Sequence, residues 1–176
     1  MELIVLGKDT NDKGKQLEEL TRYLLEDMEY TDVVVNDIRA GGQEIDVRAE
    51  RRFPSMGGEE RYRVVCECKA HKSPIAMPAW LKFLGKVFIE ETRLNRPVKG
   101  CFIALSGVNG NVEGSFDALR EDREGITLIT GDDLIRLLSR AFKIATLSDV
   151  VRDIRNSTSR QFTRISLCYY NCKIYW

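Results

Sequence analysis

The chain has 176 residues, of which 43% are apolar and 31% charged, so it can build one hydrophobic core and is too apolar for a disordered chain. Its 27 Lys and Arg residues balance 27 Asp and Glu residues. Bulk charge therefore gives no argument for nucleic-acid binding, which would depend on a local patch or a partner. No apolar run approaches the roughly 18 residues of a membrane-spanning helix, and the N-terminus lacks a signal-peptide pattern. We expect a cytoplasmic protein that does not use a membrane.

Cysteine and histidine usage excludes several classes of site. The five cysteines are odd in number and lack the spacing of a disulfide-rich secreted domain, so we interpret them as reduced thiols. A zinc site formed by Cys66, Cys68, Cys168 and Cys172 is a less favoured alternative, because neither pair has the usual two-residue spacing. His71 is the only histidine, which excludes metal sites that need two or more histidines.

The first half of the chain predicts one helix and three strands. Leucines recur at helical spacing over residues 14–28, with Asn11 and Asp12 upstream as capping residues. Residues 31–38 are rich in valine, and residues 44–52 alternate between apolar and polar side chains, which is typical of strands. A segment with Pro and Gly then leads to a strand over 61–69, so we expect an antiparallel hairpin with a long tip.

The second half predicts helices that alternate with strands. Pro74 and Pro78 precede a helix over 79–93, and we expect its apolar face to comprise Leu81, Leu84, Phe88 and Ile89. The remaining predictions are a strand over 98–105, a helix over 112–122, a strand over 126–130 and a helix from Gly131 to Ala141. This order predicts an α/β fold with a mixed sheet flanked by helices.

The C-terminal region predicts an appendage. Residues 146–155 could form a helix, and residues 161–176 have a strand-like composition with an apolar, aromatic end. We expect residues 1–142 to form one domain and residues 143–176 to form an appendage, the start of a further domain in a truncated chain. A stop codon directly after Trp176 in the source coding sequence would contradict the truncation.

Two acids and an amine are candidates for one site. Because strand side chains alternate, Glu67 and Lys69 face one side of their strand while Cys66 and Cys68 face the other. If Asp46 of the preceding strand shares the side of Glu67, both carboxylates can reach one hard cation. A Mg²⁺ ion there would take a phosphate oxygen as a ligand, and Lys69 would orient the attacking water and stabilise charge. The alternative is an ordinary solvated hairpin face, because the spacing pattern is loose.

Three details favour the metal site. An apolar run over 64–66 places Glu67 at the end of a buried strand. The Gly41-Gly42 turn allows other atoms to approach the strand of Asp46. Glu18 on the first helix supplies a third acid at the same end of the predicted sheet.

These residues, in this order, resemble a known nuclease family. Gly14-x-x-Leu17-Glu18, Gly42-x-Glu44-Ile45-Asp46-Val47 and Glu67-Cys68-Lys69 resemble the PD-(D/E)XK nuclease superfamily, specifically its Mrr-like restriction endonuclease branch. The resemblance continues through residues 73–85, 100–107 and 126–138, and covers roughly residues 14 to 138. Each motif is weak alone, and their ordered combination carries the resemblance. It implies a restriction-endonuclease-like αβββαβ core.

The resemblance also implies roles for individual residues. Asp46 and Glu67 would bind the divalent metal together with the backbone carbonyl of Cys68. Lys69 would be the catalytic lysine, and Glu18 would hold a metal-bound water or a second ion. Many Mrr-like members have Gln where this chain has Glu67, and the added negative charge should strengthen metal binding. The proline of the superfamily name is absent before Asp46, as is common in this branch.

Cationic side chains cluster on the predicted hairpin and beyond its end. They are Arg48, Arg51, Arg52, Arg61, Arg63, His71 and Lys72. Interleaved acids at 50, 59 and 60 allow cross-strand salt bridges, while a hairpin arm that grips the DNA backbone is an equally weighted interpretation. For His71 a solvated loop position is favoured over a phosphate contact.

The resemblance and the residues lead to one main functional hypothesis. We expect a Mg²⁺-dependent endonuclease, with Mn²⁺ as a substitute ion, that hydrolyses DNA as the effector domain of a prokaryotic restriction or antiviral defence protein. Its partners would be DNA and either further copies in a homodimer or higher oligomer, or a fused or associated sensor domain. The alternatives are a catalytically silent nucleic-acid-binding or assembly module and a Holliday-junction-resolvase-like enzyme.

Overall fold

The computed structural model describes residues 2–38, 43–122, 125–141, 147–158 and 166–175. Its elements, in chain order, are β1 (Glu2–Val5), α1 (Thr10–Asp27), β2 (Thr31–Ile38), β3 (Glu44–Ser55), β4 (Gly58–Lys69), α2 (Met77–Leu94), β5 (Val98–Ala104), α3 (Gly110–Asp122), β6 (Ile126–Thr130), α4 (Gly131–Ala141), α5 (Leu147–Ser157), β7 (Ser166–Tyr170) and β8 (Lys173–Tyr175). None of these helices is both long and apolar enough to span a membrane.

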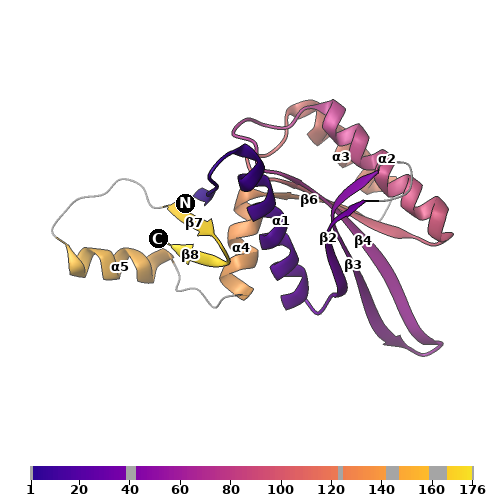
Figure 1. Ribbon diagram of the computed structural model, residues 1–176, viewed down its shortest axis with the longest axis horizontal. Helices are drawn as coiled ribbons and strands as arrows, with labels where there is room; N and C mark the ends of the chain where they lie inside the picture. The colour runs from indigo at the N-terminus through magenta and orange to yellow at the C-terminus, as the bar shows by residue number, and fades with distance from the viewer. Residues whose placement is uncertain (1, 39–42, 123–124, 142–146, 159–165, 176) are drawn as a thin grey trace.

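A five-stranded mixed sheet in the order β2-β3-β4-β5-β6 forms the centre of the fold. The pairs β2–β3 and β3–β4 are antiparallel, whereas β4–β5 and β5–β6 are parallel. Helices α1 and α4 cover one face of the sheet, and α2 and α3 cover the other (Figure 1). The predicted α/β class and αβββαβ core are therefore confirmed.

Helix α1 begins four residues before the predicted start because Asp9 caps it. The Asp9 carboxylate accepts a hydrogen bond of 2.8 Å from the backbone N–H of Asp12, which satisfies one of the free amides in the first turn. Leu17, Leu20 and Leu24 then bury the face of the helix that packs on the sheet. The cap is thus two to three residues upstream of the residues that the sequence indicated.

The expected long tip of the β3–β4 hairpin is wrong. Strand pairing continues past the predicted ends to Ser55 and Gly58, so only Met56 and Gly57 form the turn. Gly58 adopts a φ of 123°, which non-glycine residues rarely adopt, and this lets the chain reverse tightly. Proline and glycine correctly indicated a turn in this segment, but Pro54 and Gly58 themselves belong to the paired strands.

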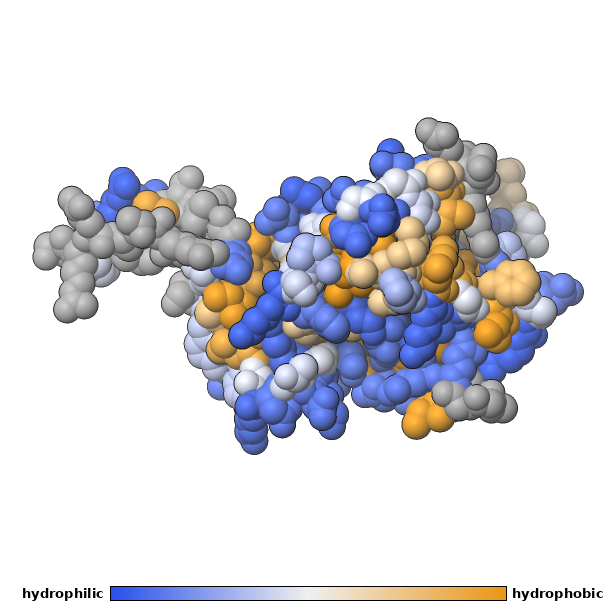
Figure 2. All heavy atoms as spheres, turned by 90° about the horizontal axis from the view of Figure 1, so that it is seen from above, coloured by the Kyte–Doolittle hydropathy of each residue, from blue (hydrophilic) through white to orange (hydrophobic). Residues whose placement is uncertain are grey.

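The predicted apolar face of α2 is wrong at three of its four residues, since only Leu84 packs against the core. Leu81, Phe88 and Ile89 are 56%, 63% and 51% exposed, and Figure 2 shows apolar residues gathered on the side of the molecule where α2 and α3 lie. The buried side carries Trp80 and Phe83 instead. Apolar residues occur on both sides of this helix, so spacing alone could not select the side that packs. Trp80 is a core residue.

A second, three-stranded sheet joins the two ends of the chain. Strand β1, which the sequence did not predict, pairs in parallel with β7, and β7 pairs with β8. Leu3, Val5, Leu167 and Tyr169 are buried in the same core cluster as the leucines of α1. The boundary proposed at residue 142 lies outside the described residues, and the domain division stays a prediction.

Candidate active site

Two carboxylates from adjacent strands face one position between the sheet and α2. Pairing of β3 with β4 ends at Val47 and Cys66, the residues next to Asp46 and Glu67. Asp46 Oδ2 accepts a hydrogen bond of 2.7 Å from the backbone N–H of Cys68. Lys86 Nζ of α2 donates to Glu67 Oε2 and lies 3.8 Å from Asp46 Oδ1. One ammonium group therefore contacts both carboxylates.

Lys69 connects this buried position to solvent. Its Nζ lies 2.6 Å from Glu67 Oε1, and its side chain is 23% exposed whereas that of Glu67 is 3% exposed. Burial alone would lower the pKa of Lys69, but the hydrogen bond and charge of Glu67, with the charge of Asp46, raise it overall. The lysine therefore stays charged at neutral pH and can still reach a group outside the protein.

Lys86 is the residue of this cluster that the sequence analysis missed. Its side chain is only 8% exposed, and it belongs to the buried side of α2 with Phe83, Val87 and Glu90. These four positions follow the i, i+3, i+4, i+7 spacing of one helix face. Charged residues within that set are unusual, and this was the signal that could have identified Lys86.

Negative charge is concentrated around Asp46. Burial and the charge of Glu67 raise the pKa of Asp46, against the lowering effects of the Cys68 amide and of Lys69 and Lys86. Burial and the charge of Asp46 likewise raise the pKa of Glu18. A cation would relieve this repulsion.

Glu18 lies near the cluster without joining it directly. Its Oε2 accepts a hydrogen bond of 3.0 Å from Asn36 Nδ2 of β2. Within the part of the chain that the structure describes, no hydrogen bond or ion pair links Glu18 to Asp46 or Glu67. Its influence on the site is electrostatic.

The cysteines of β4 point to the opposite face of the sheet, toward α1. Cys66 and Cys68 belong to the core under that helix, and Cys68 Sγ lies 3.4 Å from Thr21 Oγ1. Burial raises the pKa of the Cys68 thiol well above its usual value. The described residues hold no group of three or more His, Cys, Asp or Glu side chains suited to a metal. The Gly41-Gly42 turn lies outside the described residues.

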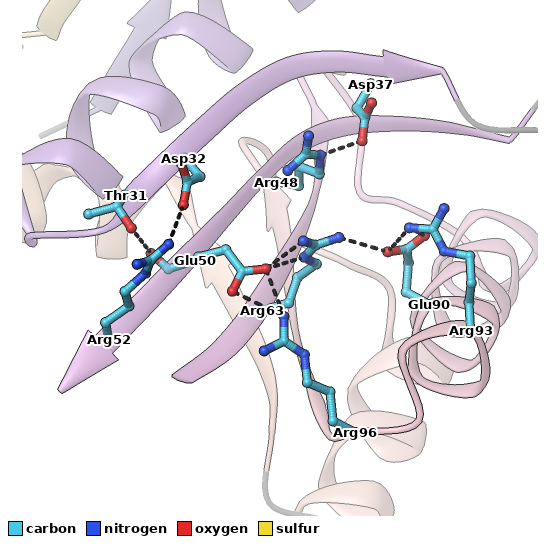
Figure 3. A network of polar contacts seen from close by, with 10 residues as sticks. All are labelled: Thr31, Asp32, Asp37, Arg48, Glu50, Arg52, Arg63, Glu90, Arg93 and Arg96. Carbon is cyan, nitrogen blue, oxygen red and sulfur yellow. Dashed lines mark hydrogen bonds and ion pairs between the residues drawn. The ribbon is translucent and has the colours of Figure 1, made fainter. Parts of the chain in front are cut away.

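Strand alternation divides the predicted DNA-binding arginines into two groups. Arg51 faces the α1 side, where its guanidinium lies 5.3 Å from the centre of the Tyr30 ring. Arg48, Arg52, Arg61 and Arg63 share the face of Asp46 and Glu67. Figure 3 shows that several of them already contact acidic side chains.

The two remaining cationic candidates follow β4. His71 is exposed, and its backbone carbonyl accepts a hydrogen bond of 2.5 Å from the Ser106 hydroxyl. Lys72 lines a surface cleft of about 730 Å³ beside β1 and the loop after β5. Neither side chain joins the Asp46 cluster in the contacts that the described residues make.

Comparison with known proteins agrees with the fold. AspBHI, a DNA modification-dependent restriction endonuclease, has a TM-score of 0.53 at 15% identity, and the match covers 86% of this chain and 37% of that one. The protein of unknown function AF1548 has a TM-score of 0.51 at 18% identity, with 81% and 77% covered. MspJI in complex with a 27-mer oligonucleotide has a TM-score of 0.47 at 13% identity, with 83% and 32% covered. This chain thus spans about a third of the length of AspBHI and MspJI.

The family assignment comes from a match along the chain itself. No curated protein matches the chain. The family model of the Mrr catalytic domain, described as restriction endonuclease, matches residues 11–138, which is more than two thirds of the sequence. The fold of the chain is shared with AspBHI, a restriction endonuclease of known structure. The chain belongs to the Mrr-like restriction endonuclease family, within the PD-(D/E)XK nuclease fold.

Proposed function

We propose that the chain is a divalent-metal-dependent endonuclease that hydrolyses DNA phosphodiester bonds, with Asp46, Glu67, Lys69 and Glu18 as its active-site residues. The observation that carries the proposal is the meeting of the buried Glu67 carboxylate and the largely buried Asp46 carboxylate with a partly exposed lysine on one face of β3 and β4. The family supplies the nuclease class.

The residues present fit a hard divalent cation. Asp46 and Glu67 offer carboxylate oxygens, and burial together with the charge of Glu67 raises the pKa of Asp46. Mg²⁺ in phosphoryl-transfer sites commonly uses one or two carboxylates and completes its shell with water and phosphate oxygens. Asp46, Glu67 and the carbonyl of Cys68 would hold the ion. Mg²⁺ is the proposed ion, and Mn²⁺ could replace it.

The side chains around the two carboxylates have separate tasks. When bound, the ion supplies Lewis acidity toward a phosphate oxygen and lowers the pKa of a water nucleophile. Lys69 holds Glu67 in place and presents a positive charge to the charge that develops on the phosphate. The Cys68 N–H fixes the rotamer of Asp46. Glu18, whose Oε2 accepts a hydrogen bond from Asn36, would hold a metal-bound water or a second ion.

A role in prokaryotic restriction or antiviral defence is part of the same proposal. The chain spans only about a third of the length of AspBHI, so the proposed unit is an effector domain that works with further copies or with a sensor domain. Its proposed location is the cytoplasm, where a defence nuclease meets foreign DNA.

Cleavage of supercoiled plasmid tests this function. Wild type, Asp46→Asn, Lys69→Met and the matched control Lys82→Met, whose side chain is exposed on α2, are compared in Mg²⁺, in Mn²⁺ and in EDTA. We expect metal-dependent cutting by wild type and Lys82→Met and at least a hundredfold loss in the other two variants. Equal activity in Asp46→Asn would place the chemistry elsewhere. Metal-dependent cutting of four-way junctions alone would favour the resolvase-like alternative.

A further inference from the structure

A cleft rich in arginine lies on the same sheet face as Asp46, farther along β3 and β4. It has a volume of about 770 Å³ and is bounded by β2, β3, β4 and the end of α2. Five arginines line it: Arg48, Arg52, Arg61, Arg63 and Arg96. Asp32 and Glu50 are the acidic residues of the lining. We refer to this feature as the arginine cleft.

Strand geometry places the arginine cleft in line with the candidate active site. On β3, Asp46, Arg48, Glu50 and Arg52 are two residues apart and so point to one face. Six residues separate Asp46 from Arg52, which corresponds to about 20 Å of strand at 3.3 Å per residue. This length equals the axial rise of about six base pairs of B-form DNA. A duplex whose axis runs along β3 could therefore contact both Asp46 and the cleft.

Buried acids hold two of the guanidinium groups in place. Glu50, only 6% exposed, accepts hydrogen bonds of 2.8 Å from Arg63 Nε and Arg96 Nη2. Glu90, 1% exposed, lies 3.5 Å from Arg63 Nη1 and also pairs with Arg93. Figure 3 shows Glu50 between Arg63 and Arg96.

These contacts orient the guanidinium groups without using all of their donors. An arginine carries five N–H donors in a fixed plane that matches phosphate oxygens. Glu50 occupies two nitrogens of Arg63 and one of Arg96, and Glu90 faces the third nitrogen of Arg63. Side chains that are already ordered lose little entropy when they bind an anion. The ion pairs at the floor of the cleft thus prepare it for a phosphate.

At the outer end of the cleft two arginines lie close together, and one of them has an acidic partner. Arg52 and Arg61 are directly opposite each other on β3 and β4, and like charges in such pairs destabilise a hairpin. Arg52 has a partly exposed partner, Asp32, at 3.3 Å. Arg61 is exposed and makes no ion pair among the described residues. An anion between the two arginines would remove their repulsion.

We propose that the arginine cleft binds phosphate groups of one DNA strand as that strand leaves the candidate active site. The inference rests on the proposed function and specifies where its substrate lies. Bidentate guanidinium contacts to the phosphodiester backbone supply affinity and fix the strand direction, and they read no base sequence.

Equilibrium binding in EDTA tests the proposal separately from hydrolysis. Anisotropy of a labelled duplex of about 20 base pairs is measured across a salt series for wild type, Arg52→Gln, Arg61→Gln and the double variant. Arg136→Gln is the matched control, because this arginine is 72% exposed on α4 and also pairs with an aspartate. Melting temperatures verify that each variant is folded.

The proposal predicts about five- to tenfold weaker duplex binding for each cleft variant, and a salt slope lower by about one per arginine removed. Affinity and slope equal to those of Arg136→Gln would overturn it. Inorganic phosphate, added against chloride at equal ionic strength, forms a second arm. If phosphate binds through Arg52 and Arg61 while the duplex does not, the cleft takes a small anion and the proposal is wrong.

Hydrolysis and cleft binding can fail independently. A wild-type protein that never cuts DNA, but whose duplex binding depends on Arg52 and Arg61, would refute the proposed hydrolysis and leave the cleft assignment in place. A protein that cuts DNA with full affinity in the double variant would refute only the cleft assignment.

Discussion

Replacing Lys86 by Met should tighten metal binding while it destabilises the protein in EDTA. The ammonium contacts the Glu67 and Asp46 oxygens that we assign to the metal, so it competes with a divalent cation for them. Methionine keeps the length and apolar stem of the lysine and removes its charge. The two carboxylates then face each other with Lys69 as their remaining cationic neighbour.

The size of the effect follows from the geometry. At an effective dielectric constant of about 20, unit charges separated by the Lys86–Asp46 distance of 3.8 Å interact with about 4 kcal/mol. A divalent ion beside the ammonium would meet a repulsion of at least that size, most of which the flexible side chain relieves by moving. We expect about 1.4 kcal/mol to remain, which is about tenfold in Kd. In EDTA, the lost ion pair should cost about 2 kcal/mol, because Lys69 still contacts Glu67.

Calorimetric titration with Mn²⁺ and thermal melts in EDTA provide the assay. Lys82→Met serves as the control, since Lys82 is exposed one turn earlier on α2 and should leave both quantities unchanged. The melting temperature of Lys86→Met in EDTA should fall by about 5 °C. Equal or weaker Mn²⁺ affinity in Lys86→Met would refute the competition between lysine and metal.

Three further predictions concern stability. Asp46→Asn should raise the melting temperature in EDTA by a few degrees, because it removes a largely buried charge beside Glu67 and keeps an acceptor for the Cys68 amide. An unchanged or lower melting temperature would contradict the repulsion between Asp46 and Glu67. Arg63 and Arg96 outweigh burial and hold the pKa of Glu50 below its ordinary 4.5, so its ion pairs stabilise the fold above that pH and are lost as the pH falls through the lowered pKa. In urea melts at pH 7, the free energy of unfolding of Glu50→Gln should therefore be about 3 kcal/mol lower than that of wild type. This difference should shrink toward pH 3, and a difference that stays constant with pH would refute the prediction. A chain ended at residue 142 should melt at least 10 °C lower or fail to fold, because β1 loses its partner β7; circular dichroism showing a native-like melt would support an independent domain instead.

Local sequence information was sufficient for the centre of the candidate site. Asp46 and Glu67 lie on consecutive strands of one hairpin, and alternation assigns each side chain to a face once the strands are recognised. The same rule places Lys69 beside Glu67. Because this geometry depends on neighbours along the chain, the sequence contained what was needed to predict it.

Long-range packing decided what the sequence could not show. Lys86 reaches Glu67 only because the Trp80 and Phe83 side of α2 packs on the sheet, and a helix that is apolar on both sides does not reveal that choice. Strand β1 has four residues and finds its partner β7 more than 150 residues later. Two strands so far apart in the chain carry no local sequence pattern that identifies them as partners.

The pairing of the arginines depends on both kinds of information. The like-charged pair of Arg52 and Arg61 follows from hairpin register. Arg63 also contacts Glu90 on α2, and this contact requires the position of the helix. The sequence therefore indicated the cationic cluster, and the structure shows which of its members are held by buried acids.

The most direct test of the central claim, that Asp46 and Glu67 hold a divalent ion, is a titration of Mn²⁺ followed by the electron paramagnetic resonance signal of the free ion. Wild type and Asp46→Asn are compared at equal concentration. We predict saturable binding by wild type and its loss in Asp46→Asn, while the variant remains folded. Identical binding by the two proteins, or no binding by either, would contradict the assignment of this site.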